Sequence, residues 1–309
     1  MDNIYDLIII GSGPAGMAAS IYAQRAMLKT LVLEKGMPGG QVVNTYEVDN
    51  YPGIPDITGF ELSTKMREHA EKLGIEVKSE EVIELFIDEQ IKKIVTPNSE
   101  YKAKSIIVCT GARWRKLGIK GEEEYTGRGV SYCATCDGAF FRNKTVAVVG
   151  GGDVAVEDAI FLARMCKRVY LLHRRDELRA VKILQDSLLK HDEEKVKILW
   201  NTEVKEIIGN SEQVEKISVF NNKTNEESEI EIDGVFVGIG TQPNSGLIKD
   251  KVKCDDLGYV ITNNSCETSL KGVYAAGDVR QKTLRQIITA AADGATSVYS
   301  AERYILENF

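Results

Sequence analysis

Two cysteines separated by two residues, Cys133 and Cys136, are the side chains of this sequence best suited to chemistry. Thiols at this spacing can close a disulfide, and at a helix start the positive end of the helix dipole lowers the pKa of the first thiol. Such a pair exchanges electrons with a partner through a mixed disulfide. Asp137 follows directly, and its carboxyl group is placed to give a proton to the thiolate that leaves.

The same spacing also occurs in half of a zinc site, so the rest of the sequence has to decide between the two. A structural zinc ion needs four ligands, and this chain has no second C-x-x-C and no histidine near the pair. We therefore favour a redox pair. The remaining cysteines have no close cysteine neighbour, and we expect all of them to be small buried hydrophobic residues: Cys109, Cys166, Cys254 and Cys266.

A glycine-rich turn near the N-terminus has the spacing of a dinucleotide-binding fingerprint. It follows an apolar run at 4–10, precedes a helical stretch at 17–23, and consists of Gly11, Ser12, Gly13, Pro14, Ala15 and Gly16. Gly11 allows the tight turn, Gly13 lets the backbone approach a pyrophosphate, and Gly16 lets the helix pack on the strand. Pro14 suits the first helical turn, whose free N–H groups bind phosphate. Glu34 ends the next apolar run and is placed to accept hydrogen bonds from ribose hydroxyls.

A second unit repeats this pattern with one informative change. The β-branched run 145–149 leads into a second turn, with a helical stretch at 156–165 and an apolar run at 169–172, and the turn consists of Gly150, Gly151, Gly152, Asp153, Val154 and Ala155. Where the first unit ends in an acid, the second continues with His173, Arg174 and Arg175, followed by Arg179. Guanidinium groups bind a 2′-phosphate through paired, charge-assisted hydrogen bonds. The second site should therefore prefer NADPH to NADH. Between the two turns, Gly138 is expected to let a planar cofactor approach the dithiol.

The order of the strand-like runs suggests that one domain is inserted into the other. The runs at 105–109 and 235–239 end in small-residue turns, and a third, at 273–276, closes on Gly277 and Asp278. A strand so late in the chain fits a return to the first domain, where Asp278 would hydrogen-bond a ribose or ribityl group. The crossovers are predicted near Leu117 and Asn244, which gives an outer domain of 1–116 with 244–309 and an inserted domain of 117–243. Residues 212–231 are expected to form a solvated β-hairpin.

Composition excludes several classes of function. With 309 residues, of which 43% are hydrophobic and 28% charged, the chain can bury the cores of two domains. Its net charge of −7, with both signs interspersed, offers no basic stripe for nucleic acid. No apolar run approaches the roughly 20 residues of a membrane-spanning helix. We expect no nucleic-acid or membrane partner and a cytoplasmic location.

Together these motifs resemble the low-molecular-weight thioredoxin reductases of the bacterial type, from about residue 4 to residue 300. The resemblance is carried in sequence order by the two fingerprints, the Cys133–Gly138 segment and the arginine cluster. It also includes Gly40-Gln41, Asn50-Tyr51-Pro52-Gly53, Gly277-Asp278 and Arg285-Gln286. It implies an α/β fold of two Rossmann-like, three-layer nucleotide-binding domains, with the NADPH domain inserted into a discontinuous FAD domain.

The resemblance also implies a function: a homodimeric flavoprotein that passes electrons from NADPH through FAD and the Cys133–Cys136 disulfide to thioredoxin. It implies that Cys136 faces the flavin, that Cys133 attacks thioredoxin, and that Asp137 is the acid and base. It extends the cofactor-binding set to Lys35, Gly40, Gln41, Asn50, Thr110, Gly111, Gly240, Arg285, Gln286 and Ile287. Asp153 departs from the Asn or Ser of many members. Two other readings remain open, a reductase of another small dithiol protein and a redox-sensing flavoprotein.

Overall fold

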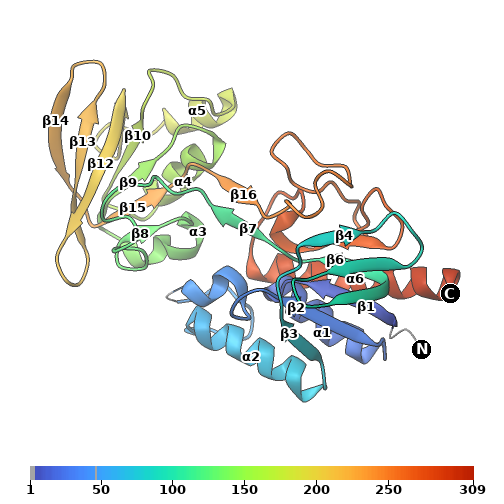
Figure 1. Cartoon of the computed structure of the whole chain (residues 1–309). Coiled ribbons are helices and arrows are strands. Elements are labelled where there is room, and N and C mark those ends of the chain that lie inside the picture. Colours follow the sequence, from blue (N-terminus) through green and yellow to red (C-terminus); the bar gives the residue numbers. More distant parts are fainter. Residues whose placement is uncertain (1–3, 46) are drawn as a thin grey trace. The chain divides into compact units, whose positions relative to one another are not determined.

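A computed structural model describes residues 4–45 and 47–309 of the chain, without the side chain of residue 44. The chain forms two compact units, one of residues 1–113 with 242–309 and one of residues 114–241 (Figure 1). The chain thus leaves the first unit after Arg113 and returns to it at Gln242. Two short strands at these crossings, β7 (Ala112–Trp114) and β16 (Thr241–Pro243), pair with each other.

The main sheet of the first unit is a parallel sheet extended by an antiparallel hairpin. Its strand order is β3-β2-β1-β6-β5-β4, with β17 beside β6. The strands are β1 (Ile4–Ile10), β2 (Thr30–Glu34), β3 (Glu76–Ser79), β4 (Glu84–Phe86), β5 (Lys92–Val95), β6 (Glu100–Val108) and β17 (Val273–Ala275). The first half of β6 pairs with β5 and its second half with β17, which brings a late strand into a sheet begun by early ones.

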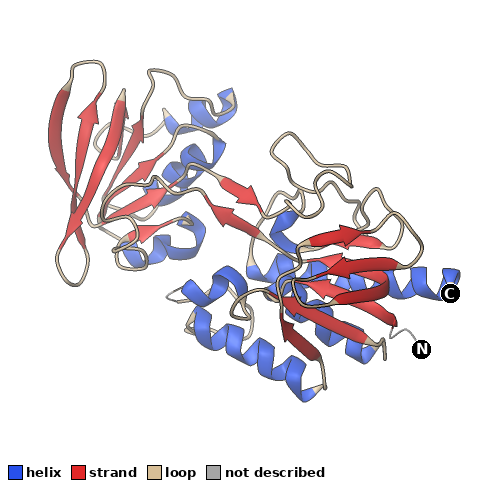
Figure 2. Cartoon of the chain, in the orientation of Figure 1, coloured by secondary structure: helices blue, strands red, loops and turns tan. Residues whose placement is uncertain are grey.

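Both faces of this sheet are covered, because alternate residues of β1 point to opposite sides. Leu7 and Ile9 pack with residues of α1 and α6, whereas Ile8 and Ile10 pack with Leu85 and other residues of the hairpin side. In Figure 2 the two helices accordingly lie along one face of the strands. The helices of the unit are α1 (Pro14–Arg25), η1 (Gly40–Asn44), α2 (Gly59–Lys72), η3 (Gly277–Val279) and α6 (Ile287–Asn308).

Helices α1 and α6 approach each other closely because α6 has a glycine at the contact. A Cβ atom at Gly294 would lie 2.1 Å from the carbonyl oxygen of Ala15. Any larger side chain at this position would push α6 away from the first turn of α1. The contact therefore fixes the start of α1 against the last helix of the chain.

The second unit is built on a fully parallel sheet of order β11-β10-β9-β15-β8. Its strands are β8 (Val130–Ser131), β9 (Thr145–Val149), β10 (Arg168–His173), β11 (Val196–Trp200) and β15 (Gly234–Val237). Its helices are α3 (Ala134–Asp137), η2 (Gly138–Phe141), α4 (Asp153–Ala163) and α5 (Lys182–Leu188). Strand β9 lies inside this sheet, between β10 and β15, as β1 lies between β2 and β6 in the first unit.

A small antiparallel sheet completes the second unit and includes the predicted hairpin. It consists of β12 (Thr202–Gly209), β13 (Val214–Asn221) and β14 (Glu226–Glu231). Val204, Ile207 and Ile217 bury its inner face against residues of the parallel sheet. The outer strand β14 is largely exposed and rich in glutamate, which protects this open edge from pairing with other chains.

The prediction of an α/β fold with two Rossmann-like units is confirmed. In each unit the strand that leads into the glycine-rich turn lies between two parallel neighbours, β2 and β6 beside β1, and β10 and β15 beside β9. In sheets of this kind, ligands bind beyond the carboxyl ends of the strands at the point where the strand order reverses. Among the described helices, none is long and apolar enough to cross a membrane.

Candidate active site and nucleotide sites

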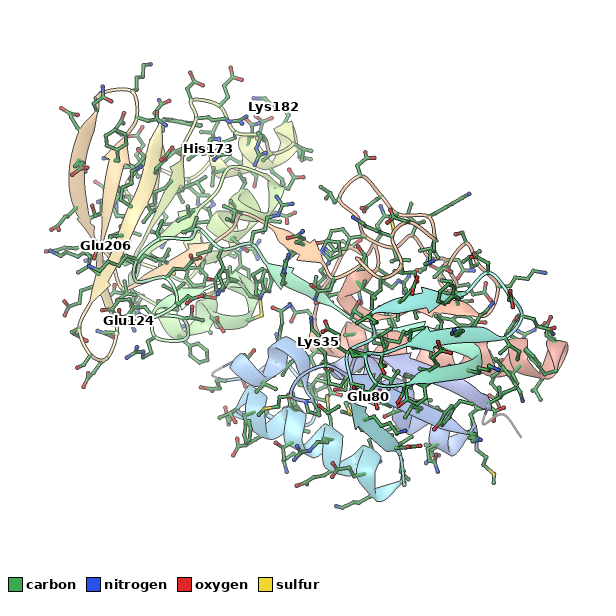
Figure 3. All side chains as sticks on the ribbon, viewed as in Figure 1. Lys35, Glu80, Glu124, His173, Lys182 and Glu206 are labelled. Carbon is green, nitrogen blue, oxygen red and sulfur yellow. A yellow bond between two sulfur atoms is a disulfide. The ribbon has the colours of Figure 1, made fainter. Side chains whose placement is uncertain are left out.

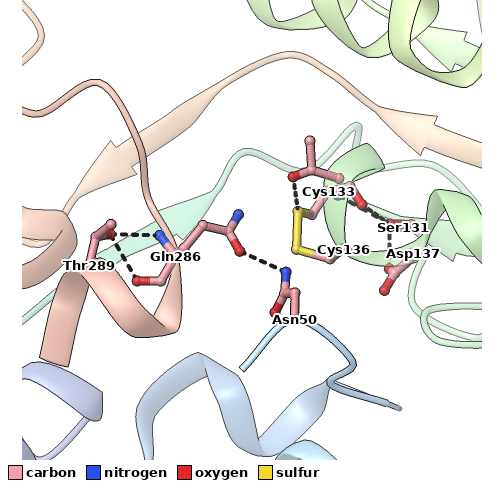
Figure 4. Close-up of a disulfide and its surroundings, with 8 residues drawn as sticks. Asn50, Ser131, Cys133, Cys136, Asp137, Gln286 and Thr289 are labelled. Atoms are coloured by element: carbon pink, nitrogen blue, oxygen red, sulfur yellow. Dashed lines mark hydrogen bonds between the residues drawn. A yellow bond between two sulfur atoms is a disulfide. The ribbon is translucent and has the colours of Figure 1, made fainter. Parts of the chain in front are cut away.

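The two cysteines of the C-x-x-C segment are joined in a disulfide, with their Cα atoms 5.3 Å apart (Figure 4). Cys133 is the N-cap of the one-turn helix α3, and its carbonyl oxygen accepts hydrogen bonds from the N–H groups of Cys136, at 3.2 Å, and Asp137, at 3.1 Å. This turn is what brings the two sulfur atoms together. Because α3 is so short, its dipole contributes less to thiolate stability than the sequence suggested.

The carboxyl group of Asp137 is held by a serine of the preceding strand. The Ser131 hydroxyl donates to Oδ2 of Asp137 at 2.6 Å and accepts from the N–H of Cys133 at 3.1 Å (Figure 4). Burial raises the pKa of Asp137 above its ordinary value, and the Ser131 hydrogen bond acts in the opposite direction. The arrangement places a carboxyl group that retains its proton more readily next to the disulfide.

Gly138 packs closely within the second unit, and the expected approach of a cofactor to it stays a prediction. A Cβ atom there would lie 3.0 Å from Leu162 and 3.1 Å from Phe161, both on α4. Gly138 is buried, and what approaches it closely is a helix of the protein itself.

The other cysteines are free thiols. Cys109, Cys166 and Cys266 are buried, as predicted, but Cys254 is only partly buried. Burial raises the pKa of Cys166 to about 11, which keeps that thiol protonated and unreactive at neutral pH.

The first fingerprint forms the turn from β1 into α1. Gly11 has a φ of +100°, a conformation that favours glycine. A Cβ atom at Gly16 would lie 1.9 Å from the carbonyl oxygen of Gly11, so only glycine lets the helix start so close to the strand. The N-cap residue Gly13 supplies no side-chain cap, and Pro14 occupies the first turn. The N–H groups at the start of α1 are thus available to an anion.

Segments from far apart in the sequence lie against this turn. The Cα atom of Gly40 is 3.8 Å from the Cβ position of Gly13, and a Cβ atom at Gly277 would lie 2.9 Å from that of Ala15. At the start of α6, Gln286 accepts a hydrogen bond from Asn50 at 3.1 Å (Figure 4). Fingerprint, η1, η3 and the start of α6 therefore lie around one end of the sheet.

The other predicted residues of this unit follow the carboxyl ends of neighbouring strands. Glu34 ends β2, but its carboxylate accepts from the N–H of Ser12 at 2.7 Å and the hydroxyl of Ser12 at 2.8 Å. The predicted hydrogen bonds to ribose thus stay a prediction, and Glu34 also stabilises the fingerprint turn.

Lys35 lies on the surface, with its side chain 74% exposed. Thr110 and Gly111 follow β6, where the Thr110 hydroxyl donates to the carbonyl oxygen of Asn244 at 2.7 Å.

Asp278 carries the clearest unsatisfied group of the first unit. Its Oδ1 atom is buried and has no hydrogen-bond partner among the described residues. Burial raises the pKa of Asp278, and Lys282 and Arg285 oppose that shift. A buried carboxylate oxygen without a donor is costly, so a ligand hydroxyl that donates to it would remove that cost.

The turn that carries Asp278 is anchored by an acid that sequence reasoning missed. Asp293, on α6, accepts from the N–H of Gly277 at 3.1 Å, from Arg280 at 2.9 Å and from Lys282 at 2.7 Å. These ion pairs are largely buried. Nothing in the local sequence indicates this role, because the partners of Asp293 lie in a separate segment.

The second fingerprint forms the turn from β9 into α4. Its N-cap, Gly152, supplies no side-chain cap, and the space beside Gly152 is open. Val154, in the first turn of α4, is 44% exposed. An uncapped helix start with an exposed apolar side chain fits a nucleotide that binds over it. Gly240, which follows β15, also faces open space.

Asp153 and His173 hold the arginine-bearing loop against this turn. Asp153 accepts from the N–H of Val181 at 2.8 Å, and the N–H of Arg179 donates to the carbonyl oxygen of Gly151 at 2.6 Å. His173, at the end of β10 (Figure 3), is buried, and its Nε2 donates to the carbonyl oxygen of Glu177 at 2.9 Å. The side chains of three residues in this loop are exposed to solvent: Arg174, Arg175 and Arg179.

Comparison with known proteins agrees with this geometry. The family pattern of the pyridine nucleotide-disulphide oxidoreductases matches residues 5–294. A thioredoxin reductase of Bacillus subtilis (strain 168) is 47% identical over 306 residues, which cover 99% of this chain and 96% of that protein. One from Peptoclostridium acidaminophilum is 47% identical over 317 aligned positions, covering 100% and 99%. The crystal structure of thioredoxin reductase from Streptococcus pyogenes MGAS5005 superposes with a TM-score of 0.94 at 47% identity over all of both chains.

Proposed function

Because the chain belongs to the pyridine nucleotide-disulphide oxidoreductase family, and within it to the thioredoxin reductases, we propose that the Cys133–Cys136 disulfide is the point where electrons leave the protein. The enzyme is an NADPH-dependent thioredoxin-disulfide reductase, with FAD and NADPH as cofactors and thioredoxin as substrate. When bound, NADPH supplies two electrons as hydride and FAD carries them to the disulfide. The observation that carries the proposal is the closed disulfide beside a hydrogen-bonded carboxyl group.

FAD is assigned to the first unit, predicted as residues 1–116 with 244–309. The uncapped start of α1 would bind its pyrophosphate, and Oδ1 of Asp278, which has no partner among the described residues, would accept from its ribityl chain. The proposed binding residues are Gly11, Ser12, Gly13, Pro14, Ala15, Gly16, Glu34, Lys35, Gly40, Gln41, Asn50, Thr110, Gly111, Gly277, Asp278, Arg285, Gln286 and Ile287.

NADPH is assigned to the second unit, predicted as residues 117–243. The start of α4 would bind the pyrophosphate, and the exposed arginines after β10 would bind the 2′-phosphate. The proposed binding residues are Gly150, Gly152, Asp153, Val154, Ala155, His173, Arg174, Arg175, Arg179 and Gly240. Within this set, the buried His173 supports the loop.

The exchange with thioredoxin requires the dithiol form. The Cys133 thiolate attacks the thioredoxin disulfide, whose S–S bond breaks while a mixed disulfide forms. Cys136 then attacks the sulfur of Cys133, which restores the Cys133–Cys136 disulfide and releases the second sulfur of thioredoxin. The dithiol loses two electrons and two protons and thioredoxin gains them, with Asp137 giving a proton to the leaving thiolate.

We further propose that the enzyme is a cytoplasmic homodimer. The free thiols of the buried cysteines suit a reducing compartment. The dimer rests on the resemblance to the family alone. Sedimentation equilibrium across a range of protein concentrations would test it, and a monomer at all of them would contradict it.

The decisive experiment measures turnover. Purified enzyme with NADPH and oxidised thioredoxin should reduce the thioredoxin disulfide, and Cys136→Ser should lower the rate to that of the mixture without enzyme. Cys254→Ser, which removes a free and partly buried thiol, is the matched control and should keep wild-type activity. A wild-type rate no higher than that of Cys136→Ser would contradict the reductase activity and favour a redox-sensing flavoprotein.

A further inference from the structure

Ser131 lies at the end of β8, is only 5% exposed, and touches both reacting partners of the dithiol segment. Its hydroxyl donates to Oδ2 of Asp137 at 2.6 Å and accepts from the N–H of Cys133 at 3.1 Å (Figure 4). We infer that Ser131 is a positioning residue that holds the Asp137 carboxyl group against the backbone of the attacking cysteine. The inference rests on the proposed role of Asp137 as the acid.

The hydrogen-bond geometry determines where the single hydroxyl proton goes. The oxygen atoms within reach are Oδ2 of Asp137 at 2.6 Å and the carbonyl oxygen of Cys133 at 3.3 Å. The short contact takes the proton, because hydrogen bonds to a carboxylate are shorter and stronger than those between neutral groups. The lone pairs of Oγ remain for the N–H of Cys133. One hydroxyl thus connects the backbone of the thiol to the group that supplies the proton.

The hydrogen bond also sets how readily the carboxyl group loses its proton. Burial raises the pKa of Asp137, and the Ser131 hydroxyl opposes this by stabilising the carboxylate. The helix packed against this segment, α4, brings Asp153, Glu157 and Asp158, and the pKa of Asp158 is itself raised to about 7 by burial and by Glu157. The pKa shift of Asp137 is caused by burial and by the Ser131 hydrogen bond. Removing the serine hydroxyl should therefore change the pKa of Asp137.

The consequence for the reaction lies in the step that releases thioredoxin. When Cys136 attacks the mixed disulfide as the thiolate, the bond between Cys133 and the thioredoxin sulfur breaks, and that sulfur leaves as a thiolate. Asp137 gives the thiolate its proton and becomes a carboxylate, which the Ser131 O–H then stabilises. Without the hydroxyl, the carboxyl group loses its fixed orientation and becomes a weaker acid.

The test compares four variants in the holoenzyme: Ser131→Ala, Ser131→Thr, Asp137→Asn and the Ser131→Ala, Asp137→Asn double variant. We expect Ser131→Ala to lower kcat for thioredoxin about tenfold, within the range for partial loss of general acid catalysis. Ser131→Thr keeps a hydroxyl and should restore kcat to within about twofold of wild type. In Ser131→Ala the fall in rate at alkaline pH should move to higher pH, because the pKa of Asp137 rises.

The double variant separates the positioning role from a structural one. If Ser131 acts through Asp137, adding Ser131→Ala to Asp137→Asn should change kcat less than twofold. Equal tenfold losses in both backgrounds, or an unshifted pH profile in Ser131→Ala, would overturn the inference. If Asp137→Asn itself keeps wild-type kcat, the proposed role of Asp137 fails instead. Thermal unfolding and flavin content of each variant show whether it is folded.

Discussion

At the scale of single residues, the exposed arginines after β10 should contribute to cofactor binding and not to the stability of the fold. Arg174 and Arg175 extend into solvent, so the fold does not depend on burying them. The loop that carries them is fixed instead by backbone hydrogen bonds and by Asp153. Removing the two guanidinium groups should therefore affect the cofactor and leave the protein intact.

We predict that Arg174→Ala with Arg175→Ala lowers the ratio of kcat/KM for NADPH to that for NADH by about 100-fold. Each charge-assisted contact to the 2′-phosphate contributes on the order of 1.5 kcal/mol, and a factor of ten corresponds to 1.4 kcal/mol. Steady-state kinetics with both nucleotides checks this. Arg164→Ala, an exposed arginine at the other end of α4, is the control and should leave the ratio unchanged. A double variant that kept its preference for NADPH would contradict the assignment.

The residues that sequence reasoning found and missed differ in one physical respect. The glycines of the fingerprints act within a single turn, so their spacing alone indicates the turn, as at Gly11 and Gly16. Ser131 acts through a side-chain hydroxyl on residues two and six positions later, and Asp293 acts on a segment 16 residues away at Gly277, and neither contact leaves a pattern of residue types in the sequence. The packing of Gly138 against α4 could not be foreseen, because a glycine beside a proposed cofactor site looks the same in sequence as one packed against a helix.

At the scale of elements, the α1–α6 contact should couple stability to cofactor retention. We predict that Gly294→Ala lowers the free energy of unfolding by about 3 kcal/mol, because its Cβ atom would lie 2.1 Å from the Ala15 carbonyl oxygen. The shift would also move the start of α1, so FAD should dissociate more readily. Thermal unfolding together with the flavin fluorescence released into solution measures both effects.

A matched substitution on the same helix checks this prediction. Ala292→Gly, at an exposed position of α6, should lower the free energy of unfolding by about 1 kcal/mol through helix propensity alone. The variant should retain FAD. Equal losses of stability in the two variants, with FAD bound in both, would show that the close approach at Gly294 is unimportant.

Helix α4 should make stability depend on pH through Asp158. Burial, together with the neighbouring Glu157, raises the pKa of Asp158 from 3.8 to about 7. For an acid whose pKa is raised on folding, the folded state binds more protons, so its stabilising contribution is complete below pH 4 and is lost as pH rises to about 7. Over this pH range the free energy of unfolding should fall by on the order of 4 kcal/mol.

Asp158→Asn should remove this dependence. The variant should unfold at a higher temperature than wild type at pH 8, and the difference should shrink or reverse at pH 5. Glu157→Gln, at an exposed position of the same helix, serves as the comparison, with a much smaller effect. Parallel melting curves of Asp158→Asn and wild type at both pH values would refute the prediction.

The elements themselves were mostly readable from sequence, for a physical reason. Apolar runs such as Ile4–Ile10 and Thr145–Val149 are buried on both faces, and only a central parallel strand combines such a run with a glycine turn. The sequence did not predict that the first half of β6 pairs with β5 and the second half with β17. Pairing over so long a sequence distance depends on the whole sheet.

At the scale of the whole molecule, the enzyme should store electrons in two places. Anaerobic titration should consume about two equivalents of NADPH per chain, one for the flavin and one for the two-electron reduction of the disulfide. The Cys133→Ser, Cys136→Ser variant should consume about one. Flavin absorbance and a count of free thiols follow the titration. Consumption of one equivalent by the wild type would place the disulfide outside the pathway.

The pairing of β17 with β6 also determines the order in which the two units can be completed during synthesis. A ribosome adds about 5–20 residues per second, so the second unit, which is continuous in sequence, is fully synthesised while the sheet of the first still lacks a strand. Helix α6, which packs on α1, follows β17 in the chain. The proposed FAD site therefore needs segments made both before and after the second unit, so flavin can be held in full only once the later segment has joined the sheet.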